Sequence, residues 1–239
     1  MKHVLERGLG FGSCSKVEWE ARRGCTIVCG NITTFGTSLL MIRILAGEKR
    51  GIHLRVARTK TVRPTAANAR QVLFDILGPS VVGTRWLDLY AGSGAVGLEA
   101  LSRGAAECVL VESSHRCIAA VGDNIARLGY ETRCRLIRAP AATALKKLAA
   151  DGQSFDMIFL DPPYEGDEAK HCLTALGSPP VSSLLSSPDG LVIAQLSVHS
   201  PILPTYGLLR LERERRIGDT CLYFYRIASP TTASVASET

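Results

Sequence analysis

From residue 84 to residue 197, short apolar runs alternate with segments whose apolar residues recur at helical spacing. The apolar runs have the length of buried strands, and each intervening segment has the length of one helix. The predicted strands are 84–90, 107–112, 133–139, 155–161 and 190–196, and the predicted helices are 95–104, 114–129, 140–152 and 167–177. Strands that alternate with helices form a parallel sheet covered on both faces. The sequence therefore predicts an α/β fold with a doubly wound, mostly parallel sheet.

The end of the chain has a different pattern. Residues 208–227 form two alternating stretches on either side of Gly218-Asp219, which predicts a terminal antiparallel hairpin. Residues 229–239 are rich in Ser, Thr and Ala and are expected to form a disordered tail. We therefore assign the α/β domain to residues 81–228.

A basic block, residues 41–80, precedes this domain. Residues 42–46 and 52–57 alternate and predict a β-hairpin, and a helix is predicted from an N-cap at Thr65 to Gly78. Between Met41 and Leu77 there are eight basic residues and two acidic ones. The basic residues are Arg43, Lys49, Arg50, Arg55, Arg58, Lys60, Arg63 and Arg70. This block suits a polyanionic partner, although a solvated, solubilising face is an equal alternative.

Residues 1–40 show no sustained strand or helix period. We expect either that Met41 is the natural start and residues 1–40 are not native, or that residues 1–40 are an appended, poorly ordered N-terminal extension. Elsewhere, no apolar run is long enough to cross a bilayer, so no membrane association is expected. The eight cysteines include no CxxC pair, which favours reduced thiols in a cytoplasmic protein without a metal site.

The first predicted strand is followed by the loop Ala91-Gly92-Ser93-Gly94, in which the backbone can approach a ligand closely. With Gly97, these glycines also match the G-x-G-x-x-G spacing of dinucleotide sites, so NAD is a competing ligand. Asp88 argues against NAD, because a carboxylate here would repel a pyrophosphate and attract the ammonium group of an amino acid.

Two further strand ends carry acidic residues. Glu112 ends the second strand, where its carboxylate can accept both ribose hydroxyls of an adenosine, although it could also be an ordinary carboxylate at a helix start. Asp161-Pro162-Pro163-Tyr164 ends the fourth strand. The two prolines make the loop rigid and remove N–H donors, which leaves the Asp161 carboxylate and the Pro162 carbonyl as acceptors for an exocyclic amine. Tyr164 offers a face on which a base could stack.

Together these strand ends resemble the class I methyltransferases that methylate amino groups, which have a Rossmann-like sheet and a loop of the form D/N/S-P-P-Y/F/W. The chain resembles more closely the RsmD family, which methylates N2 of a guanine in bacterial 16S ribosomal RNA. The resemblance covers Met41 to Ile227 and includes RILAGEKRG, RPT, LDLYAGSGAVGLEALSRGA, DPPY and YFYR. One departure is Pro140, at a position where family members usually have an acidic residue.

The resemblance implies S-adenosylmethionine as cofactor, with Asp88, Gly92 and Gly94 at its methionine end and Glu112 at its ribose. The full set of expected cofactor contacts is Asp88, Tyr90, Ala91, Gly92, Ser93, Gly94, Glu112, Ser113, Ala139 and Asp161. The residues expected to hold the guanine are Asp161, Pro162, Pro163 and Tyr164. The expected RNA contacts are Arg43, Lys49, Arg50, Arg63, Thr65 and Arg70.

We therefore expect a monomeric rRNA (guanine-N2)-methyltransferase that acts on 16S rRNA or on the assembling small ribosomal subunit. Three alternatives stay open. The same loop serves enzymes that methylate DNA adenine N6 or protein glutamine. The glycine spacing is compatible with an NAD-dependent oxidoreductase. A non-catalytic RNA-binding protein could keep the same fold.

Overall fold

The computed structural model describes residues 26–28, 31–33, 42–57, 64–163, 166–186 and 189–227. The chain divides into two compact units, Met1–Leu39 and Leu40–Thr239. In the first unit, β1 (Thr26–Val28) and β2 (Asn31–Thr33) pair antiparallel, an element that the sequence pattern did not predict. No helix among the described residues is long and apolar enough to span a membrane.

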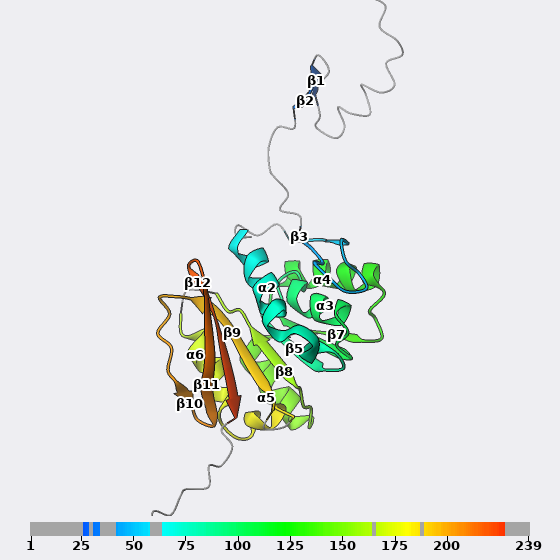
Figure 1. The fold of residues 1–239 in the computed structure, drawn as a ribbon. Coiled ribbons are helices and arrows are strands. Elements are labelled where there is room, and N and C mark those ends of the chain that lie inside the picture. Colours follow the sequence, from blue (N-terminus) through cyan, green and yellow to red (C-terminus); the bar gives the residue numbers. More distant parts are fainter. Residues whose placement is uncertain are drawn as a thin grey trace, which may run out of the picture. The chain divides into compact units, whose positions relative to one another are not determined.

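An eight-stranded sheet forms the centre of the larger unit (Figure 1). Its strands are β5 (Arg85–Leu89), β6 (Glu107–Glu112), β7 (Cys134–Arg138), β8 (Met157–Leu160), β9 (Leu191–Ser197), β10 (Thr205–Tyr206), β11 (Leu209–Ile217) and β12 (Thr220–Ile227). The strand order is β10-β11-β12-β9-β8-β5-β6-β7, and the five strands from β9 to β7 are parallel. The predicted α/β class and mostly parallel sheet are confirmed.

The terminal hairpin is also confirmed. β11 and β12 pair antiparallel, and β12 lies between β11 and β9, antiparallel to both. The hairpin therefore extends the sheet beyond β9 with strands of opposite direction. The short strand β10, which pairs with β11, was not predicted.

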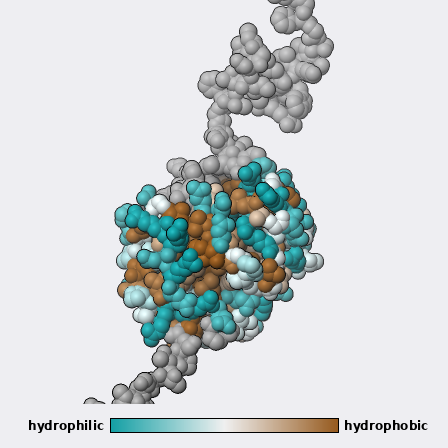
Figure 2. All heavy atoms as spheres, in the orientation of Figure 1, coloured by the Kyte–Doolittle hydropathy of each residue, from teal (hydrophilic) through white to brown (hydrophobic). Residues whose placement is uncertain are grey.

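Helices cover both faces of the sheet. The helices are α2 (Pro64–Leu77), α3 (Ala95–Ser102), α4 (His115–Leu128), α5 (Ala141–Ala150) and α6 (Glu168–Leu176), with 3-10 turns η1 (Gly78–Val81) and η2 (Val181–Leu184). One apolar core joins α2, α3 and α4 to the sheet, and a second joins α5, α6 and η2 to the opposite face. Residues on β5 alternate between the two cores, with Trp86 in the first and Leu87 and Leu89 in the second. Figure 2 shows apolar residues gathered along the boundary between α2 and the sheet, with hydrophilic residues around them.

The N-terminal part of this unit also agrees with the sequence pattern, with shorter strands. β3 (Ile42–Arg43) and β4 (His53–Leu54) pair antiparallel. The helix α2 begins at Pro64, so Thr65 lies inside its first turn and is not its N-cap as predicted. Proline suits this position because its missing N–H has no partner in the first turn.

The strand order locates the ligand crevice. From β5 the chain proceeds to β6 and β7 on one side and then crosses to β8 on the other side of β5. Ligands of open parallel sheets bind outside the carboxyl ends of the strands at such a switch point. The predicted site should therefore lie at the ends of β8, β5 and β6.

Candidate functional site

Three carboxylates lie near the ends of these adjacent strands, as predicted. Asp88 belongs to β5, Glu112 ends β6, and Asp161 follows β8. Asp88 is 1% exposed, and its Oδ2 accepts the Gly97 N–H at 3.0 Å. Burial raises the pKa of Asp88 to about 8, against the opposing effect of the Gly97 hydrogen bond, and the charges of Asp161 and Glu112 raise it further. The Asp88 side chain therefore holds the start of α3, and its contact with the methionine end of a cofactor stays a prediction.

The glycine loop has a backbone that needs its glycines. Gly92 has φ of 59° and Gly94 has φ of 76°, a left-handed conformation that residues with a Cβ seldom adopt. Gly97 is needed for space, because a Cβ there would lie 2.4 Å from Leu110 Cδ2 and 2.7 Å from Cys108 Sγ. The loop thus keeps its backbone open toward the crevice while α3 packs closely on β6.

Glu112 is tied to the same loop. Its Oε2 accepts the Gly92 N–H at 2.8 Å, and its Oε1 accepts the Ser114 N–H at 2.7 Å. Ser114 is the N-cap residue of α4, so Glu112 also acts as the predicted alternative, a carboxylate at a helix start. An ionised carboxylate has about four acceptor positions, which leaves capacity for the hydroxyls of a ribose.

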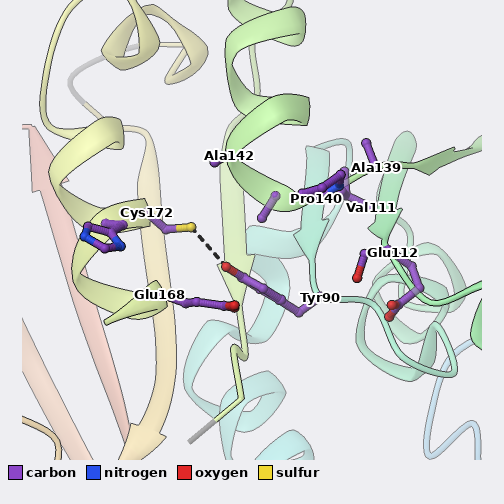
Figure 3. A pocket seen from close by; sticks show the side chains of 11 residues that line it. Tyr90, Val111, Glu112, Ala139, Pro140, Ala142, Glu168 and Cys172 are labelled. Carbon is purple, nitrogen blue, oxygen red and sulfur yellow. Dashed lines mark hydrogen bonds between the residues drawn. The ribbon is translucent and has the colours of Figure 1, made fainter. Parts of the chain in front are cut away.

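A cavity of about 180 Å³ opens beside Glu112 (Figure 3). Its lining residues are Tyr90, Val111, Glu112, Ser113, Ala139, Pro140, Ala141, Ala142, Glu168, His171 and Cys172. Four predicted cofactor contacts are therefore brought together here: Tyr90, Glu112, Ser113 and Ala139. Ala91, Ser93 and Gly94 belong to the adjoining loop and do not line the cavity. The contribution of α6 was missed, because no local pattern in the sequence places Cys172 of α6 beside Tyr90 at the end of β5.

Tyr90 is held in an uncommon conformation at the cavity wall. Its φ is 66°, which for a residue other than glycine marks a backbone constrained by its surroundings. Its hydroxyl lies 3.3 Å from the sulfur of Cys172. Burial and this contact raise the pKa of Tyr90 above its ordinary value, so the phenol is neutral at physiological pH.

These walls fit the nucleoside part of S-adenosylmethionine. Val111, Ala139, Pro140 and Ala142 give apolar surface for a flat ring, and Glu112 gives the acceptors that a ribose diol needs. Because the expected ligand carries no phosphate group, the cavity needs no buried positive charge to bind it. Among the described residues, no group of three or more His, Cys, Asp or Glu side chains could hold a metal ion.

Asp161 lies on the other side of β5 from this cavity. It is half-buried, and its Oδ2 accepts the Nε2–H of Gln195 at 3.1 Å. Gln195 is 5% exposed on β9 and was not predicted as a site residue. In the sequence, the one signal for Gln195 was the presence of a single amide side chain within the apolar run GLVIAQL. Pro162 is buried and Pro163 is exposed, whereas Tyr164 lies outside the described residues.

Arg70 differs from its predicted role as an RNA contact. It is 4% exposed, its Nη2 donates to the Arg43 carbonyl at 2.8 Å, and its Nε lies 3.6 Å from Glu99 Oε2. Glu99 is fully buried, and its two oxygens also accept the N–H groups of Leu45 and Ala46. The guanidinium is therefore enclosed where it joins α2, α3 and the β3–β4 hairpin, and it cannot reach an RNA phosphate from this position.

The other predicted RNA contacts are dispersed. Arg43 and Arg50 are exposed, and the ammonium of Lys49 lies 5.7 Å from the ring centroid of Tyr130. The backbone N–H of Lys49 donates to Ser102 Oγ at 3.0 Å, at the end of α3 remote from the glycine loop. Arg63 and the side chain of Thr65 lie outside the described residues.

A buried amide connects the basic block to the glycine loop. Asn124 on α4 is 1% exposed, accepts the Arg55 N–H at 2.7 Å, and donates to the carbonyls of Arg55 at 2.9 Å and Ser93 at 3.0 Å. Arg55 also forms an ion pair with Asp123. The segment that follows β4 is therefore attached to the glycine loop, a link that sequence reasoning missed.

Comparison with known proteins adds independent findings. A family model described as conserved hypothetical protein 95 matches residues 42–226. The chain is 32% identical over 185 residues to "Putative rRNA methyltransferase YlbH" of Bacillus subtilis (strain 168), covering 77% of this chain and 98% of that protein. It is 38% identical over 123 residues to "Ribosomal RNA small subunit methyltransferase D" of Escherichia coli (strain K12), covering 52% of this chain and 60% of that protein.

A solved structure is similar over most of this chain. A hypothetical protein of Thermus thermophilus, TTHA0928, matches with a TM-score of 0.64 and 33% identity, over 78% of this chain and 99% of that one. The family match begins at β3 and ends within β12, so it takes in the strands and helices that the structure describes in the larger unit.

Proposed function

Because the chain belongs to the RsmD family, we propose that it transfers a methyl group from S-adenosylmethionine to the exocyclic N2 amino group of a guanine in small-subunit ribosomal RNA. Membership of this family supports methyl transfer from S-adenosylmethionine to rRNA. The acceptor geometry at Asp161 supports the guanine N2 amino group as the target.

The order of the strands orients the cofactor. Asp161, Tyr90, Glu112 and Ala139 follow one another along the sheet edge, at the ends of β8, β5, β6 and β7. With the ribose at Glu112 and the reacting group near Asp161, the adenine extends toward β7. When bound, the cofactor supplies a methyl carbon that is electrophilic because it is attached to a sulfonium.

Asp161 and the Pro162 carbonyl are the proposed acceptors for the two N–H groups of the target amine. Accepting both hydrogens holds the nitrogen lone pair in one direction, which is the positioning that a direct transfer requires. Gln195 keeps the Asp161 carboxylate from rotating, and the consecutive prolines restrict the loop. Tyr164 is proposed to stack on the guanine, which must be unpaired or flipped out of its stack.

The observation that carries this proposal is the Asp161 carboxylate, held by Gln195 beside the strands that carry Glu112 and the glycine loop. The amine nitrogen would be the nucleophile and S-adenosylhomocysteine the leaving group, and the proton that the amine gives up would pass to the Asp161 carboxylate that orients it or to solvent. An NAD-dependent oxidoreductase would leave this carboxylate and the two prolines without a role.

The decisive experiment uses small subunits from a strain that lacks the protein. Purified enzyme and methyl-labelled cofactor are added, and the modified base is mapped. We expect one labelled guanine with the methyl group on N2. Label on adenine N6 or on a protein glutamine would instead support the alternative amino methyltransferases.

A variant separates the role of Asp161 from cofactor binding. Asp161→Ala should lower methyl transfer by at least about 100-fold, because one of the two acceptors is lost. Its affinity for S-adenosylhomocysteine, measured by calorimetry, should stay close to that of the wild type. Loss of cofactor affinity in a folded Asp161→Ala protein would contradict the proposed role.

A further inference from the structure

Strand β11 carries two arginines that were not predicted as RNA contacts, Arg213 and Arg215. Both are exposed, and both lie on the face of the sheet that α2 covers. We propose that Arg213 and Arg215 bind the phosphate backbone of the substrate RNA beside the target guanine. This inference rests on the proposed function, and it assigns to that function an RNA-binding surface outside the basic block of residues 41–80.

A row of neighbouring residues joins Asp161 to β11. Asp161 lies next to Gln195 on β9, and Gln195 pairs with Leu222 on β12. Leu222 in turn pairs with Arg215 on β11. The strand order places β9 and β12 between β8 and β11. Adjacent strands lie about 4.8 Å apart, so Arg215 is roughly 14 Å from Asp161 along this row, a distance that a few nucleotides can span.

The Asp161 and Gln195 side chains lie on the face of the sheet that α2 covers. Phe159 and Ile193, two positions before them on β8 and β9, belong to the core beneath α2. Side chains two positions apart on a strand share a face. The hydrogen bond between Asp161 and Gln195 agrees with this placement. The proposed catalytic carboxylate is therefore on the same side of the sheet as the two arginines.

A β-bulge directs the two arginines to this face. Before the bulge, Leu211 packs against the core beneath α5 and α6. The register between β11 and β12 shifts between Leu211 and Arg213, so Arg213 pairs with Phe224 in the core beneath α2. Without the shift, Arg213 and Arg215 would share the face of Leu211, away from Asp161. Bulges are common next to active sites, where they change the direction of a side chain in this way.

The ion pairs of the described residues leave the charges of these arginines uncompensated. Neither Arg213 nor Arg215 takes part in any of them, whereas Glu212 pairs with Arg226 at 2.9 Å. Glu214 lies between the two arginines in the sequence, and by alternation its side chain is directed to the opposite face. The planar fork of an arginine matches the geometry of a phosphate group. This part of β11 therefore fits a polyanionic backbone.

The outer edge of β11 is accessible over the same residues. β10 pairs only with Leu209 and Arg210, so no strand of the described structure covers the edge from Glu212 to Ile217 (Figure 1). Charged side chains on an open edge can also prevent the strand from pairing with another chain. That protective role predicts self-association of a neutral variant and no effect on RNA, so an experiment separates the two roles.

The test compares two neighbouring arginines on opposite faces of β11. Arg215→Gln and Arg216→Gln remove the same charge, but Arg216 pairs with Cys221 in the core beneath α5 and α6. Affinity for small subunits from the strain that lacks the protein is measured at several salt concentrations. We expect Arg215→Gln to weaken binding about tenfold and to reduce the slope of log affinity against log salt by about 0.7–1, as for one lost phosphate contact. Arg216→Gln should keep the wild-type affinity and slope.

Two further variants test the charge itself. Arg213→Gln/Arg215→Gln should reduce the salt slope by about twice as much as the single change, with a higher KM for small subunits. Its affinity for S-adenosylhomocysteine should stay unchanged, because neither arginine lines the cavity beside Glu112. Arg215→Lys keeps the charge and should restore the wild-type slope.

Unchanged RNA affinity in the folded double variant would overturn the inference, and self-association of that variant would then assign the protective role to these arginines. An equal loss in Arg216→Gln would also overturn it, because the effect would follow net charge and not the face. In both cases methyl transfer by the wild type leaves the proposed function intact. A wild type that binds small subunits through these arginines but transfers no methyl group to rRNA would instead contradict the proposed function alone.

Discussion

Gln195 donates its Nε2–H to Asp161 Oδ2 at 3.1 Å and thereby joins the carboxyl ends of two neighbouring parallel strands. The last paired residues of these strands are Leu160 and Ala194, so Asp161 and Gln195 occupy the next position on each strand. Equivalent positions on adjacent parallel strands direct their side chains to the same face. The orientation of the proposed catalytic carboxylate thus depends on a residue 34 positions away in the chain.

Gln195→Leu should lower the rate of methyl transfer by about 10- to 100-fold, because a hydrogen bond to a charged group contributes about 1.5–3 kcal/mol. The affinity for S-adenosylhomocysteine should not change, since Gln195 does not line the cavity beside Glu112. Single-turnover kinetics and calorimetry measure the two effects. Ser197→Ala, at the end of the same strand, is the control and should keep the wild-type rate. An equal loss in both variants would indicate a general effect on the strand end.

Asp88→Asn should change the pH dependence of stability. The folded pKa of Asp88 is raised to about 8, whereas an unfolded aspartate has a pKa of about 3.9. Between these values the folded protein holds a proton that the unfolded chain has lost, so the free energy of unfolding decreases as pH rises from about 4 to about 8. Asparagine keeps an acceptor for Gly97 and does not titrate.

The free energy of unfolding, measured with urea at several pH values, should therefore fall relative to the Asp88→Asn variant across this range. Above about pH 8 the difference between the two proteins should level off. A difference that is constant from about pH 4 to about pH 8 would show that Asp88 is ionised in the folded protein.

Gly97→Ala should destabilise the protein by about 1–3 kcal/mol, because the new methyl group would overlap Leu110 and Cys108 in a packed core. Gly122→Ala is the matched control, since Gly122 also lies within a helix but a Cβ there would meet no atom within 4 Å. The control should gain roughly 0.5–1 kcal/mol from its higher helix propensity. Thermal and urea unfolding of the two variants should therefore shift in opposite directions.

Arg70→Met should lower the free energy of unfolding by about 2–4 kcal/mol, because it removes a buried ion pair with Glu99 and a hydrogen bond to the Arg43 carbonyl. Under conditions where the variant is folded, its RNA affinity should equal that of the wild type. Arg43→Ala should have little effect on the free energy of unfolding, but it should weaken RNA binding and make that binding less dependent on salt. If Arg70→Met reduces the salt dependence of RNA binding instead, Arg70 contacts phosphate as the sequence had suggested.

Local signals in the sequence are sufficient for much of this protein. The order and type of the elements from β3 to β12 follow from periods of about 2 and 3.6 residues, with only the two-residue β10 and the 3-10 turns missed. The glycine loop and the carboxylates at Asp88, Glu112 and Asp161 are also local features, because each follows or ends a recognisable strand. The rule for parallel sheets then places them at one edge.

Other features are determined only when distant segments meet. Arg70 is a basic residue in a basic block, and its burial depends on Glu99, which lies in another helix. Glu168 and Gln195 lie in α6 and β9, and their relation to Tyr90 and Asp161 depends on how these elements pack across the sheet. Neighbours in the sequence cannot specify the role of a charged or amide side chain. The free energy of such a side chain in the folded protein depends on the hydrogen-bonding partners and the solvent around its terminal atoms. The sequence alone determined the fold and the strand ends that carry the chemistry, whereas the tertiary structure decided which polar side chains support the site and which support the core.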